Sequence, residues 1–254
     1  MFINNLNPVA LEIFSLKIHW YSLAYIFGIM FGWIYCKKKL IDDKKILDLF
    51  DGLINYLIIG IIVGGRVGYI LIYNLDYYLA NISEILMIWK GGMSFHGGLV
   101  GIVVSTFIFS KKNNVNAFIF LDLIAIVAPI GIFLGRISNF INSELYGKES
   151  DIFWSVKFLA VDEVYRHPSQ IYEAIFEGIF LFLILNYLYR KKFFINPGVI
   201  SSIFLILYSV FRIIIEYFRE PDIQLGYLIY NLTMGQIVSI IFLIFGIYLF
   251  FKKK

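Results

Sequence analysis

The stretch GIFLGRISNFINSELYG, residues 131–147, joins an apolar run to polar groups that an apolar environment resists. A cation, two amides and a carboxylate stand close together here: Arg136, Asn139, Asn142 and Glu144. Arg136 and Asn139 are three residues apart, so on a helix they share one face. What these groups do depends on the medium that surrounds the chain.

The composition indicates that this medium is lipid. The chain has 254 residues, of which 60% are hydrophobic and 16% are charged. Soluble domains have about 45–50% apolar and about 25% charged residues. A water-soluble fold of this length could not bury so much apolar surface behind so few charges. The lone cysteine, Cys36, excludes an internal disulfide.

Seven segments are long and apolar enough to cross a bilayer, which takes about 20 predominantly apolar residues. They lie at 19–36, 52–73, 95–110, 117–137, 169–189, 198–217 and 233–251. The sequence therefore predicts an all-α, polytopic membrane protein with about seven transmembrane helices.

The basic residues predict the orientation of these helices. Thirteen of the 22 Lys and Arg residues follow segments one, three, five and seven: Lys37, Lys38, Lys39, Lys44, Lys45, Lys111, Lys112, Arg190, Lys191, Lys192, Lys252, Lys253 and Lys254. Cytoplasmic loops carry the excess of Lys and Arg. We therefore expect the N-terminus outside and the C-terminus in the cytoplasm.

No linker or repeat divides the chain, so we expect residues 1–254 to form a single integral membrane domain. Residues 1–18 lack the basic n-region and the cleavage site of a signal peptide. They are expected to form a short external arm, and residues 138–168 an external loop region.

Three arginines lie inside or at the edge of these spans: Arg66, Arg136 and Arg212. An Arg in mid-membrane costs at least about 2.5–3.5 kcal/mol, so such residues usually face a cavity or a partner. Arg212 and Glu216 are four residues apart and can pair on one helix face. A purely structural ion pair would explain Arg212 equally well. Arg136 alone could be a snorkelling anchor, although this leaves the neighbouring amides and carboxylate unexplained.

Other polar residues occur at the same predicted depth. Glu173 and Glu177 are like charges four residues apart, which repel unless a cation or a proton intervenes. His96 lies between glycine pairs in GGMSFHGGLVG, and Tyr21 begins segment one. A lone histidine is more often structural than catalytic.

Glycines recur at intervals of four, which lets membrane helices pack closely. The pattern occurs at Gly60, Gly64 and Gly68, at Gly97 and Gly101, and at Gly131 and Gly135. We interpret it as a packing signal.

Together these residues predict an anion site within the membrane, open to the outer leaflet. The planar fork of arginine suits phosphate, and the abundant phosphates at that depth are lipid head groups. No HExxH or DxxxD pattern occurs, so we expect no metal and no cofactor.

Four motifs, in this order and spacing, resemble the prolipoprotein diacylglyceryl transferases of bacterial membranes: GGMSFHGGLVG, GRISNFINSELYG, RHPSQIYE and FRIIIEYFREPD. HWYSLAY, GGRVGYILIYN and TMGQIVSI extend the resemblance from about residue 19 to about residue 240.

The resemblance implies a reaction at the outer face of the bacterial inner membrane, the first step of lipoprotein maturation. The diacylglyceryl group of phosphatidylglycerol would move to the lipobox cysteine thiol of a prolipoprotein, releasing glycerol 1-phosphate. Expected partners are phosphatidylglycerol, prolipoprotein signal peptides and membrane lipid, without nucleic acid.

The resemblance also implies residue roles. Arg136 and Arg212 would grip the phosphate and stabilise the leaving oxygen, and His96 or Tyr21 would help to deprotonate the thiol. Substrate binding would further involve Asn139, Glu144, Glu216, Arg66 and Arg166. The substrate supplies the nucleophile, so Cys36 should be dispensable.

Two other classes of function were weighed against this one. A small-anion transporter needs polar groups reachable from both faces, yet the inner halves of the spans offer little beyond Asp122. A seven-helix receptor would explain the topology but not the clustered polar residues.

Overall fold

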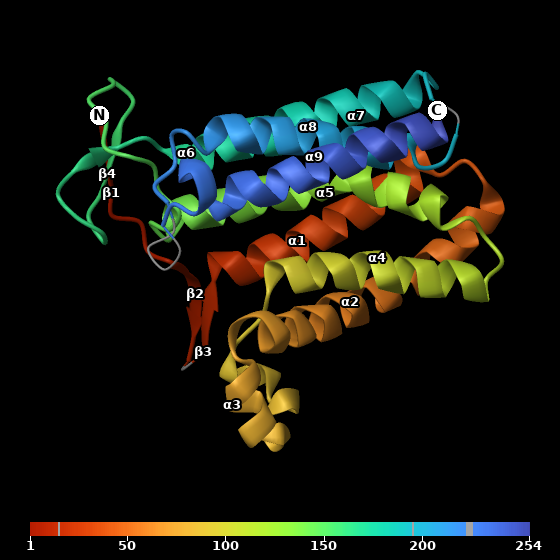
Figure 1. Ribbon diagram of the computed structural model, residues 1–254, viewed down its shortest axis with the longest axis horizontal. Coiled ribbons are helices and arrows are strands. Elements are labelled where there is room, and N and C mark those ends of the chain that lie inside the picture. The colour runs from red at the N-terminus through yellow and green to blue at the C-terminus, as the bar shows by residue number, and fades with distance from the viewer. Residues whose placement is uncertain (15, 195, 222–225) are drawn as a thin grey trace. The chain divides into compact units, whose positions relative to one another are not determined.

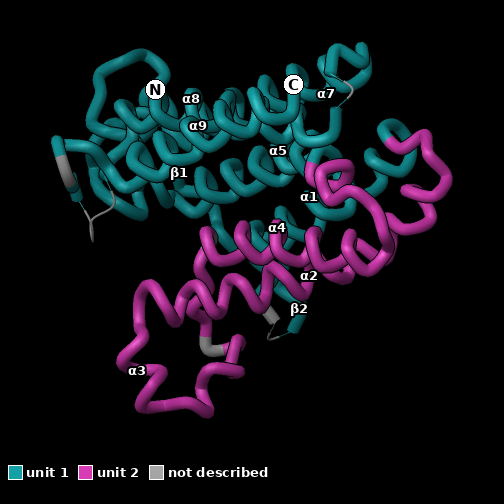
Figure 2. Tube along the Cα trace, turned by 45° about the vertical axis from the view of Figure 1, so that its right-hand side comes forward, with its two compact units in different colours: residues 1–40, 122–254 teal, residues 41–121 magenta. Residues whose placement is uncertain are grey.

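The computed structural model describes residues 1–14, 16–194, 196–221 and 226–254. The chain packs as two compact units, which Figure 2 colours separately. Unit 1 comprises residues 1–40 and 122–254, and unit 2 comprises residues 41–121. Each unit is described by itself. The expectation of a single integral domain stays a prediction.

Five helices of the described residues are long and apolar enough to cross a membrane. They are α2 (Lys44–Tyr73), α5 (Ala117–Ile141), the continuous helix Ser169–Arg190, α8 (Val199–Ile215) with Glu216 added, and α9 (Met234–Lys253). The polytopic, mostly helical fold is therefore confirmed. Two further predicted spans are helical but are not among these five: α1 (Trp20–Tyr35), with 16 residues, and α4 (Phe95–Lys112), with 18. The count of seven spans stays a prediction.

In unit 1, α1, α5, α8, α9 and the helix Ser169–Arg190 form the helical body, in which α8 and α9 run side by side (Figure 1). The helix Ser169–Arg190 consists of α6 (Ser169–Glu173), a π-helical stretch η4 (Ala174–Phe180) and α7 (Leu181–Arg190). A second π-helical stretch, η1 (Cys36–Leu40), continues α1. Such π segments are rare and occur frequently at functional sites.

Asp122 of α5 is buried and caps the first turn of α8. Its carboxylate accepts hydrogen bonds from the backbone N–H groups of Gly198 and Ser201, both at 2.7 Å, and from the Ser201 hydroxyl at 2.5 Å. The first N–H groups of a helix have no partner within the helix. Asp122 thus has a structural explanation that needs no transport pathway.

Short strands occur at the end of unit 1 where α5 ends and α6 begins. In the three-stranded sheet, β1 (Phe2–Asn4) pairs in parallel with β4 (Val156–Phe158), which pairs antiparallel with β5 (Tyr165–Arg166). A separate hairpin joins β2 (Val9–Ile13) to β3 (Leu16–His19). The all-α prediction is therefore incomplete, because the N-terminal arm and the 138–168 region share a small sheet.

In unit 2, α2 and α4 pack with their backbones almost touching. A Cβ atom on Gly64 would fall onto the Gly97 carbonyl oxygen, and one on Gly101 would fall onto the Gly60 carbonyl oxygen. Only glycine permits this approach, so the packing signal is confirmed here. It fails at Gly135 of unit 1, where an added Cβ would meet no atom within 4 Å.

The connection between α2 and α4 contains α3 (Leu75–Ala80) and two 3₁₀ turns, η2 (Ile82–Leu86) and η3 (Ile88–Lys90). A last short turn, η5 (Ile229–Asn231), precedes α9 in unit 1.

Candidate active site

Arg136 and Arg212 are joined through two buried carboxylates. Arg136 Nε lies 3.1 Å from Glu173 Oε2, and Arg136 Nη2 lies 3.3 Å from Glu177 Oε2. Arg212 Nη1 forms an ion pair with Glu173 Oε1 and lies 3.8 Å from Glu177 Oε1. Each glutamate therefore contacts both arginines. Three separate helices, α5, α8 and Ser169–Arg190, contribute to the cluster.

Glu216 extends this cluster along α8. Arg212 Nη2 forms an ion pair with Glu216 Oε2 at 2.8 Å, which confirms the predicted pair, and Arg219 Nη1 lies 3.6 Å from the same oxygen. The Thr233 hydroxyl donates to Glu216 Oε1 at 2.7 Å. A Cβ on Gly235 would lie 2.8 Å from that oxygen. The start of α9 thus closes around the Glu216 carboxylate.

Burial explains why cations and carboxylates occur together. The side chains of Glu173 and Glu177 are fully buried, and that of Arg212 is 7% exposed. Unpaired buried charges are very costly. The sequence leaves open whether a cation or a proton relieves the repulsion between the two glutamates, and the structure places arginines against both. The Arg136 side chain is 17% exposed, which makes it the more accessible of the two arginines. Within the described residues, no group of three His, Cys, Asp or Glu side chains is arranged to hold a metal.

A second polar group lies at the end of α5. The buried Asn139 side chain donates to the Tyr21 hydroxyl and, at 3.4 Å, to Glu144 Oε2. Asn142 Nδ2 lies 3.5 Å from Glu144 Oε1, and Gln170 donates to the Glu144 backbone carbonyl at 2.7 Å. The structure thus brings together three predicted residues, Tyr21, Asn139 and Glu144.

The turn that presents Glu144 has an uncommon backbone. Ser143 and Leu145, on either side of Glu144, have φ angles of 57° and 55°. Non-glycine residues in the left-handed region are strained, and they cluster at functional sites. Gly147 follows in a crowded position, since a Cβ there would meet the carbonyl oxygens of His167 and Phe218. This explains the glycine that ends the motif.

Arg166 has partners within its own loop region. Its Nη2 lies 2.5 Å from Asp162 Oδ2, its Nη1 lies 3.6 Å from Glu220 Oε2, and its guanidinium lies over the Tyr146 ring. The hydrogen bond from Arg166 lowers the pKa of Asp162. Partial burial lowers the pKa of His167, next in the chain. Arg166 is thus held by contacts that need no ligand, and its role in substrate binding stays a prediction.

Arg66 and His96 belong to unit 2. The Arg66 side chain is buried, and its guanidinium donates to five backbone carbonyls of the connection before α4: those of Glu84, Ile85, Met87, Gly91 and Gly92. Arg66 therefore organises that connection. His96 is half-buried in the first turn of α4, which Ser94 caps. These contacts do not test the predicted roles of Arg66 in substrate binding and of His96 in catalysis.

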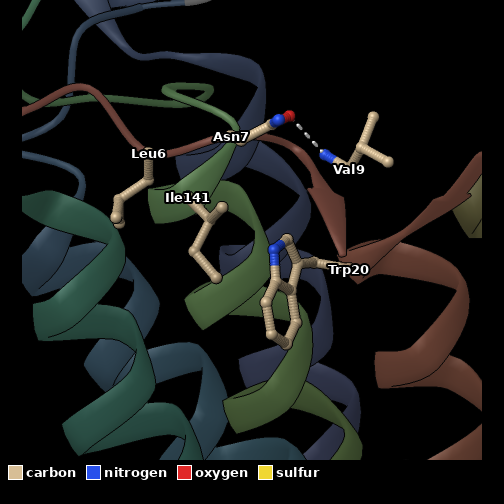
Figure 3. A pocket seen from close by; sticks show the side chains of 5 residues that line it. All are labelled: Leu6, Asn7, Val9, Trp20 and Ile141. Carbon is tan, nitrogen blue, oxygen red and sulfur yellow. Dashed lines mark hydrogen bonds between the residues drawn. The ribbon is translucent and has the colours of Figure 1, made fainter. Parts of the chain in front are cut away.

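A mainly apolar pocket of about 250 Å³ opens in unit 1 (Figure 3). It is lined by residues of the N-terminal segment, α1 and α5: Leu6, Asn7, Val9, Trp20 and Ile141. Trp20 precedes Tyr21 in sequence, and Ile141 follows Asn139 by two residues. The pocket lining has no charged residue, so the pocket suits an apolar group rather than an anion.

Sequence reasoning gave no role to several residues of the cluster. In the sequence, Glu173 and Glu177 stand out only for their like charge, and Arg219 and Thr233 do not stand out as site residues. Two carboxylates four residues apart in an apolar helix were the available signal. The sequence offers no such signal for Thr233, because the Glu216 that it contacts lies 17 residues earlier in the chain.

Comparison with known proteins identifies the family. A family model described as prolipoprotein diacylglyceryl transferase matches residues 8–252. Proteins named phosphatidylglycerol–prolipoprotein diacylglyceryl transferase are similar over nearly the whole chain. Those of Rickettsia bellii (strain OSU 85-389) and Rickettsia typhi are both 49% identical, covering 98% of this chain and 96% and 97% of their own lengths. That of Ehrlichia canis is 48% identical, covering 96% of this chain and 94% of its own length. The chain therefore belongs to the prolipoprotein diacylglyceryl transferase family.

Proposed function

We propose that this protein transfers the diacylglyceryl group of phosphatidylglycerol to the lipobox cysteine thiol of prolipoproteins and releases glycerol 1-phosphate. The relatives are named for this pair of substrates. The observation that carries the proposal is the buried pairing of Arg136 and Arg212, from two apolar helices, through shared carboxylates. Guanidinium groups bind phosphate oxygens with matching planar geometry.

The chemistry follows from the products. A bond forms between the cysteine sulfur and the glyceryl carbon that bears the phosphate ester. The bond from that carbon to oxygen breaks, and the oxygen leaves with glycerol 1-phosphate. Negative charge grows on the departing phosphate, where preorganised cations stabilise the transition state. The thiol proton must also leave, because a free cysteine has a pKa of about 8.5 and the thiolate is the nucleophile.

The geometry supports a division of roles. Arg136, the more exposed arginine, would contact the phosphate first, and Arg212 would stabilise the leaving oxygen. Glu216 would orient Arg212, and Asn139 with Glu144 would orient the head group beside Tyr21. Tyr21 or His96 would accept the thiol proton. Contacts to backbone carbonyls make Arg66 a weaker candidate for substrate binding, as contacts to Asp162 and Glu220 do for Arg166.

We also propose seven spans in the bacterial inner membrane, with the N-terminus outside, the C-terminus cytoplasmic and the site toward the outer face. At 1.5 Å per residue, α1 alone is short for a hydrocarbon core of about 30 Å, but η1 lengthens it. The sheet that joins β1 to β4 and β5 places the N-terminal arm and the 138–168 region at one end of unit 1. This supports an external location for both.

A reconstituted assay tests the proposed function. Purified protein in phosphatidylglycerol vesicles is given a lipobox peptide, and glycerol 1-phosphate release is measured. The wild type should modify the peptide but not its Cys→Ser counterpart. Arg136→Ala and Arg212→Ala should lose turnover, whereas Arg190→Ala, at the exposed end of α7, should retain it. Wild-type turnover in either of the first two variants would refute the assignment.

A further inference from the structure

The arginine cluster is electrically balanced before any lipid binds. Among the described residues, ion pairs join three guanidinium groups, of Arg136, Arg212 and Arg219, to three carboxylates. The carboxylates are those of Glu173, Glu177 and Glu216. A phosphodiester that enters this cluster adds a negative charge to a buried, neutral array. Because buried charge without compensation is costly, one carboxylate must give way to the phosphate.

The two glutamates between the arginines are held unequally. Glu173 is in close ion contact with both arginines, through Arg212 Nη1 and, at 3.1 Å, through Arg136 Nε. Glu177 has the longer contacts: it accepts a hydrogen bond from Arg136 at 3.3 Å and lies 3.8 Å from Arg212. One oxygen of each glutamate, Glu173 Oε2 and Glu177 Oε1, is buried without a hydrogen-bond partner among the described residues. Glu177 is thus the carboxylate whose contacts cost least to give up.

The backbone distinguishes the same two residues. Glu173 is the last residue of α6, and Glu177 lies inside the π-helical stretch η4. A π segment is a local departure from regular helix geometry that recurs at functional sites. Glu177 also contacts Arg136, which is the more exposed arginine of the pair. The ionisable groups that face Glu177 include Arg136 from α5, Arg212 and Tyr208 from α8, and Glu173 from its own helix.

We propose that Glu173 and Glu177 are positioning residues with different tasks. Glu173 holds the two guanidinium groups side by side, so that both reach one phosphate. Glu177 occupies the place of the phosphate on Arg136 in the empty enzyme and yields it when the anionic lipid binds. This inference rests on the proposed function. It makes Glu177 a competitor of the lipid and Glu173 a part of the catalytic geometry.

Glutamine variants separate the two tasks, because glutamine keeps the shape and removes the charge. Turnover is measured against the mole fraction of phosphatidylglycerol in vesicles, at saturating lipobox peptide. For Glu177→Gln, the apparent KM for phosphatidylglycerol should fall by about fivefold or more, since a like charge beside the bound anion is gone. For Glu173→Gln, kcat should fall by about tenfold or more, because misplaced catalytic groups lose rate steeply. Glu163→Gln, which alters an exposed ion pair, is the matched control and should change neither.

A conservative variant covers failure to fold, since removing one partner of a buried ion pair can unfold a protein. Glu177→Asp keeps the charge but shortens the reach toward Arg136, so the KM should again fall, by a smaller factor. An unchanged or higher KM in Glu177→Gln would overturn the proposal. If Glu177→Gln does not fold, Glu177→Asp decides instead, and an unchanged or higher KM in that variant would overturn the proposal. Equal effects of the two glutamine substitutions on kcat would also overturn it. A wild-type protein that transfers no diacylglyceryl group would instead refute the proposed function.

Discussion

The contact between Gly178 and Phe133 offers a way to disturb the arginine cluster without removing any of its charges. Gly178 follows Glu177 on the helix Ser169–Arg190, and Phe133 lies one turn before Arg136 on α5. A methyl group on Gly178 would lie 2.8 Å from Phe133 Cβ and 3.1 Å from Phe133 Cα. Favourable carbon–carbon contacts begin at about 3.5 Å, so the two helices must separate by roughly 0.7 Å.

The expected effect of Gly178→Ala is larger on turnover than on stability. Overpacking costs about 1–3 kcal/mol, and alanine regains about 1 kcal/mol over glycine in a helix. The net loss of stability should therefore be below about 2 kcal/mol. The same shift moves Glu173, on the same helix as Gly178, away from Arg136. Because a displacement of about 1 Å can cost roughly 10²-fold in rate, we expect kcat to fall by about tenfold.

The assay is glycerol 1-phosphate release from reconstituted vesicles, with thermal unfolding of the same samples as the check on stability. Gly131→Ala is the matched control, because a Cβ at Gly131 of α5 meets no atom within 4 Å. It should keep wild-type turnover. If Gly178→Ala also turns over at the wild-type rate, the placement of Glu173 against Arg136 does not govern the reaction.

Three further predictions concern the framework. In thermal unfolding, Gly101→Ala should destabilise unit 2 by at least about 2 kcal/mol. Gly98→Ala should not, because a Cβ there lies 3.7 Å from its nearest neighbour. Equal melting temperatures of the two variants would contradict the close packing. Asp122→Ala should cost about 1–2 kcal/mol, as loss of a helix cap does, and a wild-type melting temperature would disprove the cap. Asp162 has a lowered pKa through its hydrogen bond with Arg166. Its stabilisation is therefore present above the ordinary Asp pKa of about 3.9 and is lost as the pH falls through the lowered value. Acid should increase the rate of proteolysis of residues 138–168 in the wild type, but it should not increase the rate in Asp162→Asn. An equal increase in both proteins would contradict this.

The helical body could be predicted from the sequence because apolar runs and charge spacing are local signals. The Arg212–Glu216 pair follows from an interval of four residues, and the need for a cation or a proton between Glu173 and Glu177 follows from their like charge. The sequence does not indicate which cations lie beside the two glutamates. Arg136 and Arg212 lie 37 residues before and 39 residues after Glu173, on other helices.

The short strands were not predicted for a similar reason. β1 has three residues, too few for an alternating pattern, and it pairs with β4 more than 150 residues later. Arg66 illustrates a different limit. A buried arginine in an apolar helix looks the same in sequence whether its guanidinium binds a ligand or, as here, donates to backbone carbonyls of the next connection.

We expect one lipid phosphate to contact both arginines. An experimental structure of the protein in a lipid nanodisc with bound phosphatidylglycerol would test this. Phosphate oxygens should lie within hydrogen-bonding distance, about 2.7–3.2 Å, of both the Arg136 and Arg212 guanidinium groups, with Glu177 drawn away from Arg136. A phosphate bound elsewhere, with both arginines still engaged by Glu173 and Glu177, would contradict it.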